Sequence, residues 1–319
     1  VSPLCHEPRV ALAVLEAMLA PHVSNGRIRI LHRHRPVAAR RECGDRVAAV
    51  IVRDLDRGCE TELRATWFLD ATENGDLLPL AGVEHITGAE ARSETSEAGA
   101  PEQAAPANIQ AFSQCFVLEE EAGADHLIPP PRRYDFWRAY VPRLSPPWPG
   151  PLLGWAGLNP RTMQVIRYNF NPHREKPGMF AGLWAFRRII DRAQFAPGAY
   201  ASDLCLVNWP MIDYLEGDLL LGDEATRQAR IEDAKQLSLS MVRWLQTEAP
   251  RPDGGTGWPG LRLRGDLLGT RDGLAMAPYI RESRRIRAVK TVVERDVSAT
   301  FRPGETLAER YDDSVGIGY

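Results

Sequence analysis

The chain has 319 residues, enough for about two domains at roughly 100 to 200 residues each. Hydrophobic residues make up 44% and charged residues 25%, a composition typical of globular proteins and not of disordered or fibrous ones. The net charge of -3 gives no electrostatic reason to expect a nucleic-acid partner or an anionic membrane surface. No apolar run approaches the roughly 20 residues of a membrane helix, so we expect a cytoplasmic protein without a membrane partner.

Cysteine and histidine residues form no recognisable metal or disulfide pattern. The five cysteines are odd in number and too widely spaced for a C-x-x-C metal site or a dense disulfide framework. His32 and His34 would share one face of a strand, but the arginines beside them would repel a cation. The H-E-x-x-H, G-x-S-x-G and G-K-S/T motifs are also missing. We therefore expect no metal site, and the zinc-protease, serine-hydrolase and P-loop classes lack their usual signals.

The first 90 residues predict one helix followed by several strands. Apolar residues three and four apart predict an amphipathic helix over residues 10–19, ended by Pro21. Alternating or apolar runs predict strands over residues 27–31, 47–52, 62–64 and 66–69. The last of these leads into a polar turn, residues 70–76, after which a helix starts at Leu77.

The rest of the chain begins with an unpatterned segment, residues 88–106, that predicts a loop and a domain boundary. Many prolines over residues 129–160 predict an extended surface segment. Helices are predicted over residues 180–193 and 222–247, and strands over 111–118, 261–264, 286–293 and 300–302. Residues 255–260 match G-x-G-x-x-G, but no strand precedes them, so they predict a flexible turn and not a dinucleotide site.

The polar turn over residues 70–76 carries three carboxylates at the end of an apolar run. Such carboxylates can cap the following helix, act as acid and base groups, or face a nucleotide. The residues themselves leave these three interpretations open.

Phe68-Leu69-Asp70-Ala71-Thr72-Glu73-Asn74-Gly75-Asp76-Leu77 resembles the second flavin-contacting motif of FAD-dependent oxidoreductases in the glutathione-reductase-like superfamily. Three further segments resemble a bacterial branch of that family: residues 2–8, Asn208-Trp209-Pro210 with Asp213-Tyr214, and residues 278–286. The family's N-terminal G-x-G-x-x-G and its C-terminal flavin-binding segment have no counterpart here. The resemblance therefore implies a fragment of a flavoprotein that is inactive alone and binds FAD weakly, if at all.

The implied fold class is α/β, part of a Rossmann-like FAD-binding domain with an inserted α+β substrate or cap domain. Residues 1–90 would be the remainder of the FAD-binding domain, 91–285 the inserted domain, and 286–319 the return toward the FAD-binding domain. The implied reaction is the oxidation or reduction of a small organic substrate through bound FAD, with an electron acceptor that the sequence does not specify.

The resemblance assigns residues to three roles, each with a structural alternative. Implied cofactor-binding residues are Val37, Ala71, Thr72, Glu73, Gly75 and Asp76, with helix capping as the alternative for the turn. Implied substrate-binding residues are Asn208, Trp209, Asp213 and Tyr214, with a core tryptophan and a satisfied asparagine as the alternative. Implied catalytic residues are Arg281, Arg284 and Arg285, with a salt-bridge cluster around Glu282 as the alternative.

Two rival functions stay open from the sequence. A carbohydrate-type hydrolase would use two of Asp213, Glu216 and Asp218 as a carboxylate pair about 5 to 10 Å apart. A non-catalytic binding module would instead present an exposed apolar patch and no cofactor pocket.

Overall fold

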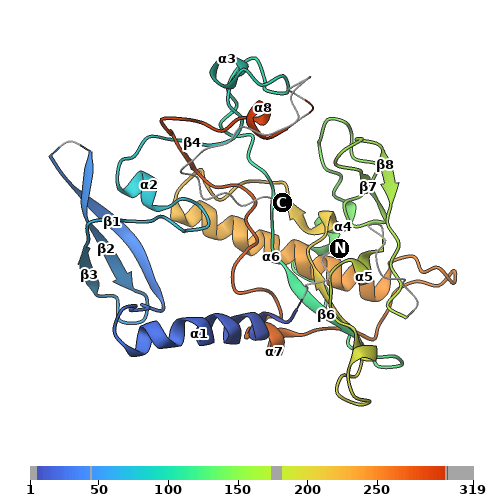
Figure 1. The fold of residues 1–319 in the computed structure, drawn as a ribbon. Coiled ribbons are helices and arrows are strands. Elements are labelled where there is room, and N and C mark those ends of the chain that lie inside the picture. Colours follow the sequence, from blue (N-terminus) through green and yellow to red (C-terminus); the bar gives the residue numbers. More distant parts are fainter. Residues whose placement is uncertain (1–5, 44, 174–181, 299, 301–319) are drawn as a thin grey trace. The chain divides into compact units, whose positions relative to one another are not determined.

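A computed structural model describes residues 6–43, 45–173, 182–298 and 300 (Figure 1). The chain forms two compact units. Unit 1 comprises residues 1–31 and 111–281, and unit 2 comprises residues 32–110 and 282–319. The predicted domains, 1–90, 91–285 and 286–319, have different limits and stay a prediction. In the described part of the chain, no helix is both long enough and apolar enough to cross a membrane.

A four-stranded antiparallel sheet lies at the centre of unit 1. In sheet order its strands are β12 (Leu261–Leu263), β6 (Phe116–Glu120), β10 (Leu204–Val207) and β9 (Arg188–Ile190). Strand β6 is buried along its whole length. Its side chains alternate between the two faces of the sheet, so Phe116 and Leu118 join one apolar cluster and Val117 joins another.

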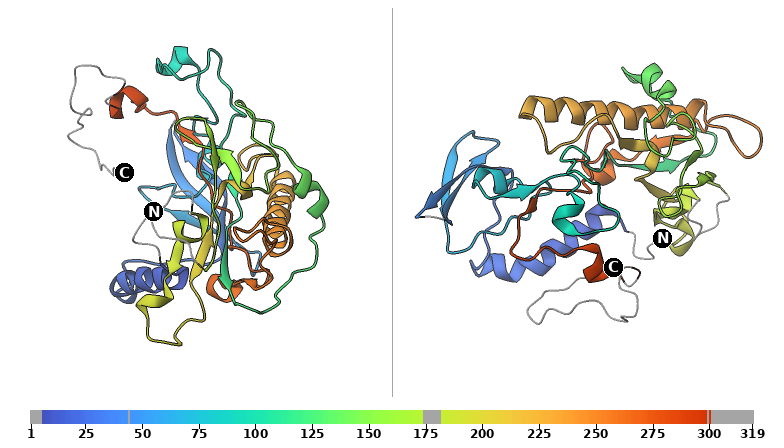
Figure 2. Two further views of the ribbon diagram at one scale, coloured as in Figure 1. Left: turned by 90° about the vertical axis from the view of Figure 1, so that its right-hand side faces the viewer. Right: turned by 90° about the horizontal axis from the view of Figure 1, so that it is seen from above.

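Helix α6 (Glu224–Thr247) covers the face that carries Phe116 and Leu118 (Figure 2). Its first turn is capped by Asp223, whose carboxylate accepts a hydrogen bond from the Thr226 backbone N–H at 2.8 Å. The predicted helix over residues 222–247 is therefore confirmed. The opposite face packs on Leu267 of helix α7 (Gly265–Leu268), against which helix α1 (Pro8–Ser24) lies.

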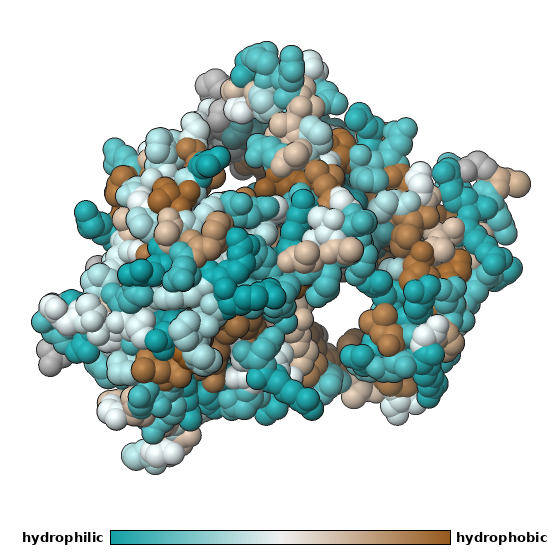
Figure 3. All heavy atoms as spheres, turned by 180° about the vertical axis from the view of Figure 1, so that it is seen from behind, coloured by the Kyte–Doolittle hydropathy of each residue, from teal (hydrophilic) through white to brown (hydrophobic). Residues whose placement is uncertain are grey.

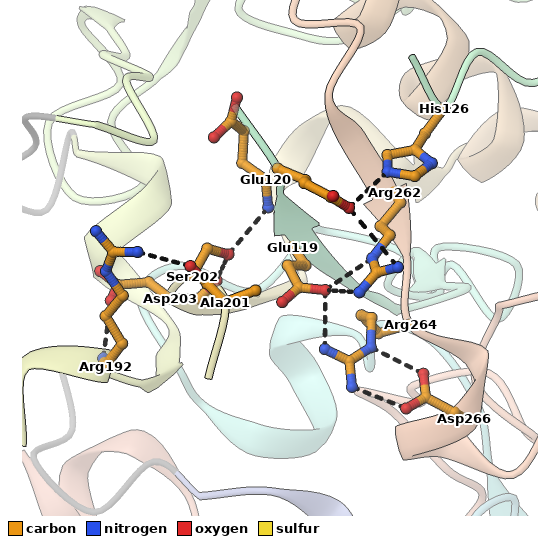
Figure 4. Close-up of polar contacts among 11 residues, drawn as sticks. Glu119, Glu120, His126, Arg192, Ala201, Ser202, Asp203, Arg262, Arg264 and Asp266 are labelled. Atoms are coloured by element: carbon orange, nitrogen blue, oxygen red, sulfur yellow. Dashed lines mark hydrogen bonds and ion pairs between the residues drawn. The ribbon is translucent and has the colours of Figure 1, made fainter. Parts of the chain in front are cut away.

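Strand β6 also carries a fully buried carboxylate, Glu119. Figure 4 shows this side chain pointing toward two arginines on the β12 side, Arg262 and Arg264. One Glu119 oxygen accepts from Arg262 Nη2 at 2.6 Å and from Arg264 Nη1 at 2.9 Å. Because an unpaired buried charge is costly, these two arginines are what allow Glu119 to sit inside the sheet.

Shorter elements complete unit 1. They are β5 (Phe112–Ser113), α4 (Tyr134–Ala139), β7 (Ala156–Leu158), β8 (Val165–Arg167), α5 (Leu183–Phe186), η1 (Arg192–Gln194), η2 (Pro210–Ile212) and β11 (Asp213–Tyr214). The predicted strand over residues 111–118 is present as β5 and β6, and the glycine-rich residues 255–260 form the predicted loop before β12. The predicted helix over 180–193 is wrong, because residues 188–190 pair with β10 as an edge strand and only one helical turn, α5, precedes them.

Unit 2 is built on a three-stranded antiparallel sheet in the order β1 (His34–Glu42), β2 (Arg46–Asp54) and β3 (Glu60–Arg64). Its other elements are α2 (Leu77–Leu80), β4 (His85–Ile86), α3 (Arg92–Thr95), β13 (Arg285–Ile286) and α8 (Glu294–Val297). The predicted strands over 47–52 and 62–64 and the helix starting at Leu77 are confirmed. The predicted strand over 286–293 is reduced to β13, which pairs with β4, and residues 301–302 lie outside the described part.

Two predicted strands are absent. Residues 27–31 connect α1 to the turn before β1, and residues 66–69 are extended but pair with no strand in the described chain. Trp67 is 81% exposed and Leu69 is 87% exposed, so the predicted buried strand is wrong. The parallel sheet of a Rossmann-like domain is also not seen, because all pairs between named strands in the described residues are antiparallel.

Helix α1 confirms the prediction of a helix near the start of the chain, but it differs in its end and its burial. It continues past Pro21 to Ser24, so the proline lies inside the last turn of the helix and does not end it. None of its residues is buried, and most of its large apolar side chains, Met18 among them, are exposed. Apolar patches are visible among hydrophilic residues on the face shown in Figure 3.

Met241, fully buried on α6, tests the core of unit 1. We expect Met241→Ala to lower the free energy of unfolding by about 2–5 kcal/mol, because it leaves a cavity between α6 and the sheet. Urea denaturation followed by tryptophan fluorescence measures this, since every tryptophan except Trp67 belongs to unit 1. Met276→Ala, at a site that is 77% exposed, is the control and should change stability by less than about 0.5 kcal/mol. Equal losses in the two variants would contradict this description of the core.

Candidate functional site

Four polar side chains from distant parts of the sequence meet in unit 1: Ser113, Asn208, Asp213 and Arg281, here called the Arg281 cluster. Strands β5 and β11 pair Ser113 directly with Asp213, and the backbone of Tyr279 pairs with Ser113 from the other side. Asn208 follows β10, and the proline-started turn η2 leads from there to Asp213. Strand pairing and the η2 turn therefore collect the cluster from three separate segments, residues 111–113, 208–213 and 279–281.

Asp213 accepts two hydrogen bonds within the cluster. Its Oδ1 accepts from Ser113 Oγ at 2.6 Å and from Arg281 Nη2 at 2.9 Å. Removal from bulk water raises the pKa of the Asp213 carboxyl, and the charge of Arg281 opposes that rise. Each of these two side chains is 25% exposed, so the ion pair is partly buried and water still reaches it.

The Arg281 guanidinium makes most of its contacts with other groups of unit 1. Nη1 donates to the Ala111 carbonyl at 2.8 Å and to Ser113 Oγ at 2.9 Å, while Nη2 also donates to Asn208 Oδ1 at 3.0 Å. The guanidinium carbon lies 5.0 Å from the centre of the Tyr279 ring, a cation–π contact. These contacts fit the salt-bridge alternative, and a catalytic role for Arg281 stays a prediction.

The other two predicted substrate residues point into the core. Trp209 is buried beside Phe170, and its Nε1 has no hydrogen-bond partner among the described residues. The Tyr214 hydroxyl donates to Asp233 at 3.0 Å, and burial raises its pKa. The structure therefore brings Asn208 and Asp213 together with Arg281 and gives the two aromatic residues the packing role that was the alternative.

Cys115 lies next to the Arg281 cluster and was not predicted to take part. Burial raises the pKa of its thiol to about 12, while the charges of Arg281 and Arg187 act to lower it. Cys115 and Cys205 are buried, whereas Cys43 and Cys59 are exposed.

In unit 2, side-chain hydrogen bonds organise the polar turn over residues 70–76. Asp70 Oδ1 accepts from both the backbone N–H and the hydroxyl of Thr72, and Asp70 Oδ2 accepts from the Leu77 backbone at 3.0 Å. The Thr72 hydroxyl in turn accepts from the Asp76 backbone at 2.7 Å. Asp70 therefore caps the start of α2, which is part of the alternative interpretation of this turn.

Arg284 closes the turn from the C-terminal segment of unit 2. Its Nη1 donates to the Asn74 carbonyl at 2.9 Å and to Asp76 Oδ1 at 3.2 Å. Gly75 has φ +62°, and a Cβ at this position would lie 3.0 Å from the Arg284 carbonyl. A side chain at Gly75 would thus be strained twice, by the backbone conformation and by close contact with Arg284.

Some polar groups of the turn are not used by the protein itself. Within the described residues, no hydrogen bond is made by the backbone N–H groups of Ala71, Glu73 and Asn74. The Asn74 Oδ1 atom is buried and also has no partner there. The turn can therefore offer both donors and an acceptor to a bound molecule.

Arg285 and Val37 have local roles in unit 2. Arg285 Nη1 donates to Glu282 at 2.9 Å, and Glu282 also accepts from the backbone N–H groups of Gly88 and Gln110. This is the salt-bridge cluster that was the alternative for the arginines. Val37 lies in β1 at an irregularity in its pairing with β2, between Pro36 and Ala38.

Comparison with known proteins identifies the family of the chain. A family model described as FAD dependent oxidoreductase matches residues 1–319. The chain belongs to this family. No curated protein and no solved structure matches it. Membership in the FAD-dependent oxidoreductases implies a flavoprotein and an oxidoreductase, and it leaves the substrate unidentified.

The carboxylates of the rival hydrolase have internal partners. Glu216 accepts from the Tyr140 hydroxyl at 2.5 Å. Asp218 accepts from the Leu220 and Leu221 backbones and pairs with Arg230 at 3.3 Å. With Asp213 paired to Arg281, each of the three has a structural partner, and no observation favours the hydrolase.

Ser113, Asn74 and Cys115 were missed by sequence reasoning. Ser113 and Asp213 are 100 residues apart and no local motif connects them, so only strand pairing shows their contact. Asn74 lies inside the flavin-like motif, and its place there was the one available signal.

We expect Arg281→Gln to lower the free energy of unfolding by about 1–3 kcal/mol, because it leaves Asp213 with Ser113 alone. Water reaches the pair, so the loss should be smaller than for a sealed ion pair. The double variant Asp213→Asn/Arg281→Gln should lose less than the two single variants added together. A double-mutant cycle by urea denaturation measures this, and simple additivity would show that the two side chains are not coupled.

The cysteines give a chemical test of burial. In a Cys5→Ser protein, which leaves only the described cysteines, we expect two thiols, Cys43 and Cys59, to react rapidly with DTNB at pH 8. Cys115 and Cys205 should react only after denaturation, because their thiols are buried and a pKa of about 12 leaves Cys115 almost entirely protonated. Rapid reaction of three or four thiols in the native protein would contradict the placement of Cys115.

Proposed function

We propose that the chain acts as an FAD-dependent oxidoreductase on a small organic substrate, with the cofactor held at residues 70–76 and the substrate bound beside the Arg281 cluster. Membership in the family across residues 1–319 carries this proposal.

The polar turn of unit 2 fits a nucleotide cofactor chemically. FAD presents phosphate oxygens that accept hydrogen bonds and hydroxyl and ring N–H groups that donate them. The unused backbone N–H groups of Ala71, Glu73 and Asn74 match the acceptors, and the buried Asn74 Oδ1 matches a donor. Thr72 and Asp76 would act indirectly, since their side chains hold the turn in shape.

When bound, FAD supplies the electron transfer, and the protein supplies binding, orientation and electrostatics. Arg284 would keep the turn closed by its contacts with Asn74 and Asp76. Arg281 would act as a positioning residue, because it fixes the Asn208 side-chain oxygen and the Asp213 carboxylate on one guanidinium.

The first experiment is an absorption spectrum of the purified protein, followed by titration of FAD monitored by flavin fluorescence. We expect flavin absorption or saturable binding of added FAD. Asn74→Ala should weaken FAD binding about tenfold, because it removes one polar contact with the cofactor. Asn108→Ala changes an exposed asparagine of the same unit and should bind FAD like the unmodified protein.

The result that would contradict the proposal is a colourless protein that does not bind added FAD. Equal binding by the Asn74→Ala and Asn108→Ala variants would instead contradict the placement of the cofactor at residues 70–76.

A further inference from the structure

One end of the four-stranded sheet in unit 1 gathers residues from three strands. Strands β6, β10 and β9 are antiparallel neighbours, so the start of β6, the end of β10 and the start of β9 lie at the same end. Cys115 precedes β6, Asn208 follows β10, and Arg187 precedes β9. The Leu206 backbone N–H donates to the Arg187 carbonyl at 3.0 Å, which fixes Arg187 at this place.

Arg187 is half-buried, and no acid among the described residues compensates its charge. Its side chain makes no hydrogen bond or ion pair with any described residue, and its Nε atom is buried without a partner. Its described contact is a cation–π one, with the guanidinium carbon 5.4 Å from the centre of the Phe186 ring. The next residue shows the contrast, because Arg188 pairs with Asp191 at 2.8 Å and Asp203 at 2.9 Å.

An unpaired guanidinium in this position is costly to the folded protein. Removing an arginine from water is compensated by an acid or by several acceptors in most proteins. Asp213, the acid of the Arg281 cluster, is already paired with Arg281. Arg187 lies at the same end of the sheet as Cys115 and Asn208, and its charge, like that of Arg281, acts to lower the pKa of the Cys115 thiol.

We propose that Arg187 binds an oxyanion of the substrate, a carboxylate or a phosphate, at this end of the sheet. A guanidinium presents parallel N–H donors that match two oxygens of such a group. Asn208 supplies a second donor, because its Oδ1 accepts from Arg281 and its Nδ2 makes no hydrogen bond within the described chain. The inference rests on the proposed function, since it takes this region of unit 1 as the substrate site.

Isothermal titration calorimetry with malonate and with inorganic phosphate tests the proposal on the purified protein. We expect saturable binding of one or both anions, and tighter binding of malonate or of phosphate distinguishes a carboxylate substrate from a phosphorylated one. Arg187→Gln should weaken binding about 10- to 100-fold, the loss of a charge-assisted contact. Arg187→Lys keeps the charge without the planar donors. Its anion affinity should lie between those of the unmodified protein and the Arg187→Gln variant.

Arg167→Gln is the matched control, because it removes the same charge from an exposed position of unit 1 and should leave anion binding unchanged. Arg187→Gln should unfold at the same or a higher urea concentration than the unmodified protein, since it removes an uncompensated charge. Unfolding at a clearly lower concentration would show that Arg187 is structural and would overturn the proposal.

Absence of binding by both anions, or equal binding by the Arg187→Gln and Arg167→Gln variants, would also overturn it. FAD titration of the same proteins keeps this test separate from the proposed function. If the protein binds FAD normally but binds neither anion, only the role of Arg187 is contradicted and the proposed function is not. Anion binding that depends on Arg187, in a protein that does not bind FAD, supports the anion site and contradicts the proposed function.

Discussion

The candidate site of unit 1 depends on the charge of Asp213 being matched by Arg281. Strand pairing brings Asp213 next to Ser113, and desolvation there makes its ionised form costly without a cation. Arg281 provides that cation and at the same time bonds to the Ala111 carbonyl and to Asn208. One guanidinium thus joins three segments of the chain and holds the side chains of Ser113, Asn208 and Asp213 together.

The need to compensate a buried charge also distinguishes the structural arginines of this unit from Arg187. Glu119 is buried in β6 and pairs with Arg262 and Arg264, so these charges compensate one another within the sheet. Arg187 lies at the end of the same sheet, but no acid in the described part of the chain pairs with it. A charge that the fold leaves uncompensated is available to a ligand, whereas a compensated one is mainly structural.

Sequence patterns were most reliable where local interactions decide the structure. The helix over residues 224–247 follows from an Asp223 cap and an apolar stripe, and the hairpin of β2 and β3 follows from its turn residues. The apolar run over residues 66–69 failed because a strand needs a neighbour, and the described chain provides none there. For residues 188–190 the error was the reverse: their spacing predicted a helix, but pairing with β10 makes them a strand.

The sequence by itself determined the family and the motif over residues 68–77, because a turn motif is a local pattern that survives without its surroundings. It also marked Asn208, Asp213 and Arg281, although not as partners of one another. Only the tertiary structure decided that Ser113 joins them, that Arg284 closes the turn at Gly75, and that Arg187 pairs with no acid among the residues described. These contacts join residues far apart in the chain, and their energies depend on burial and charge compensation, which spacing along a sequence does not record.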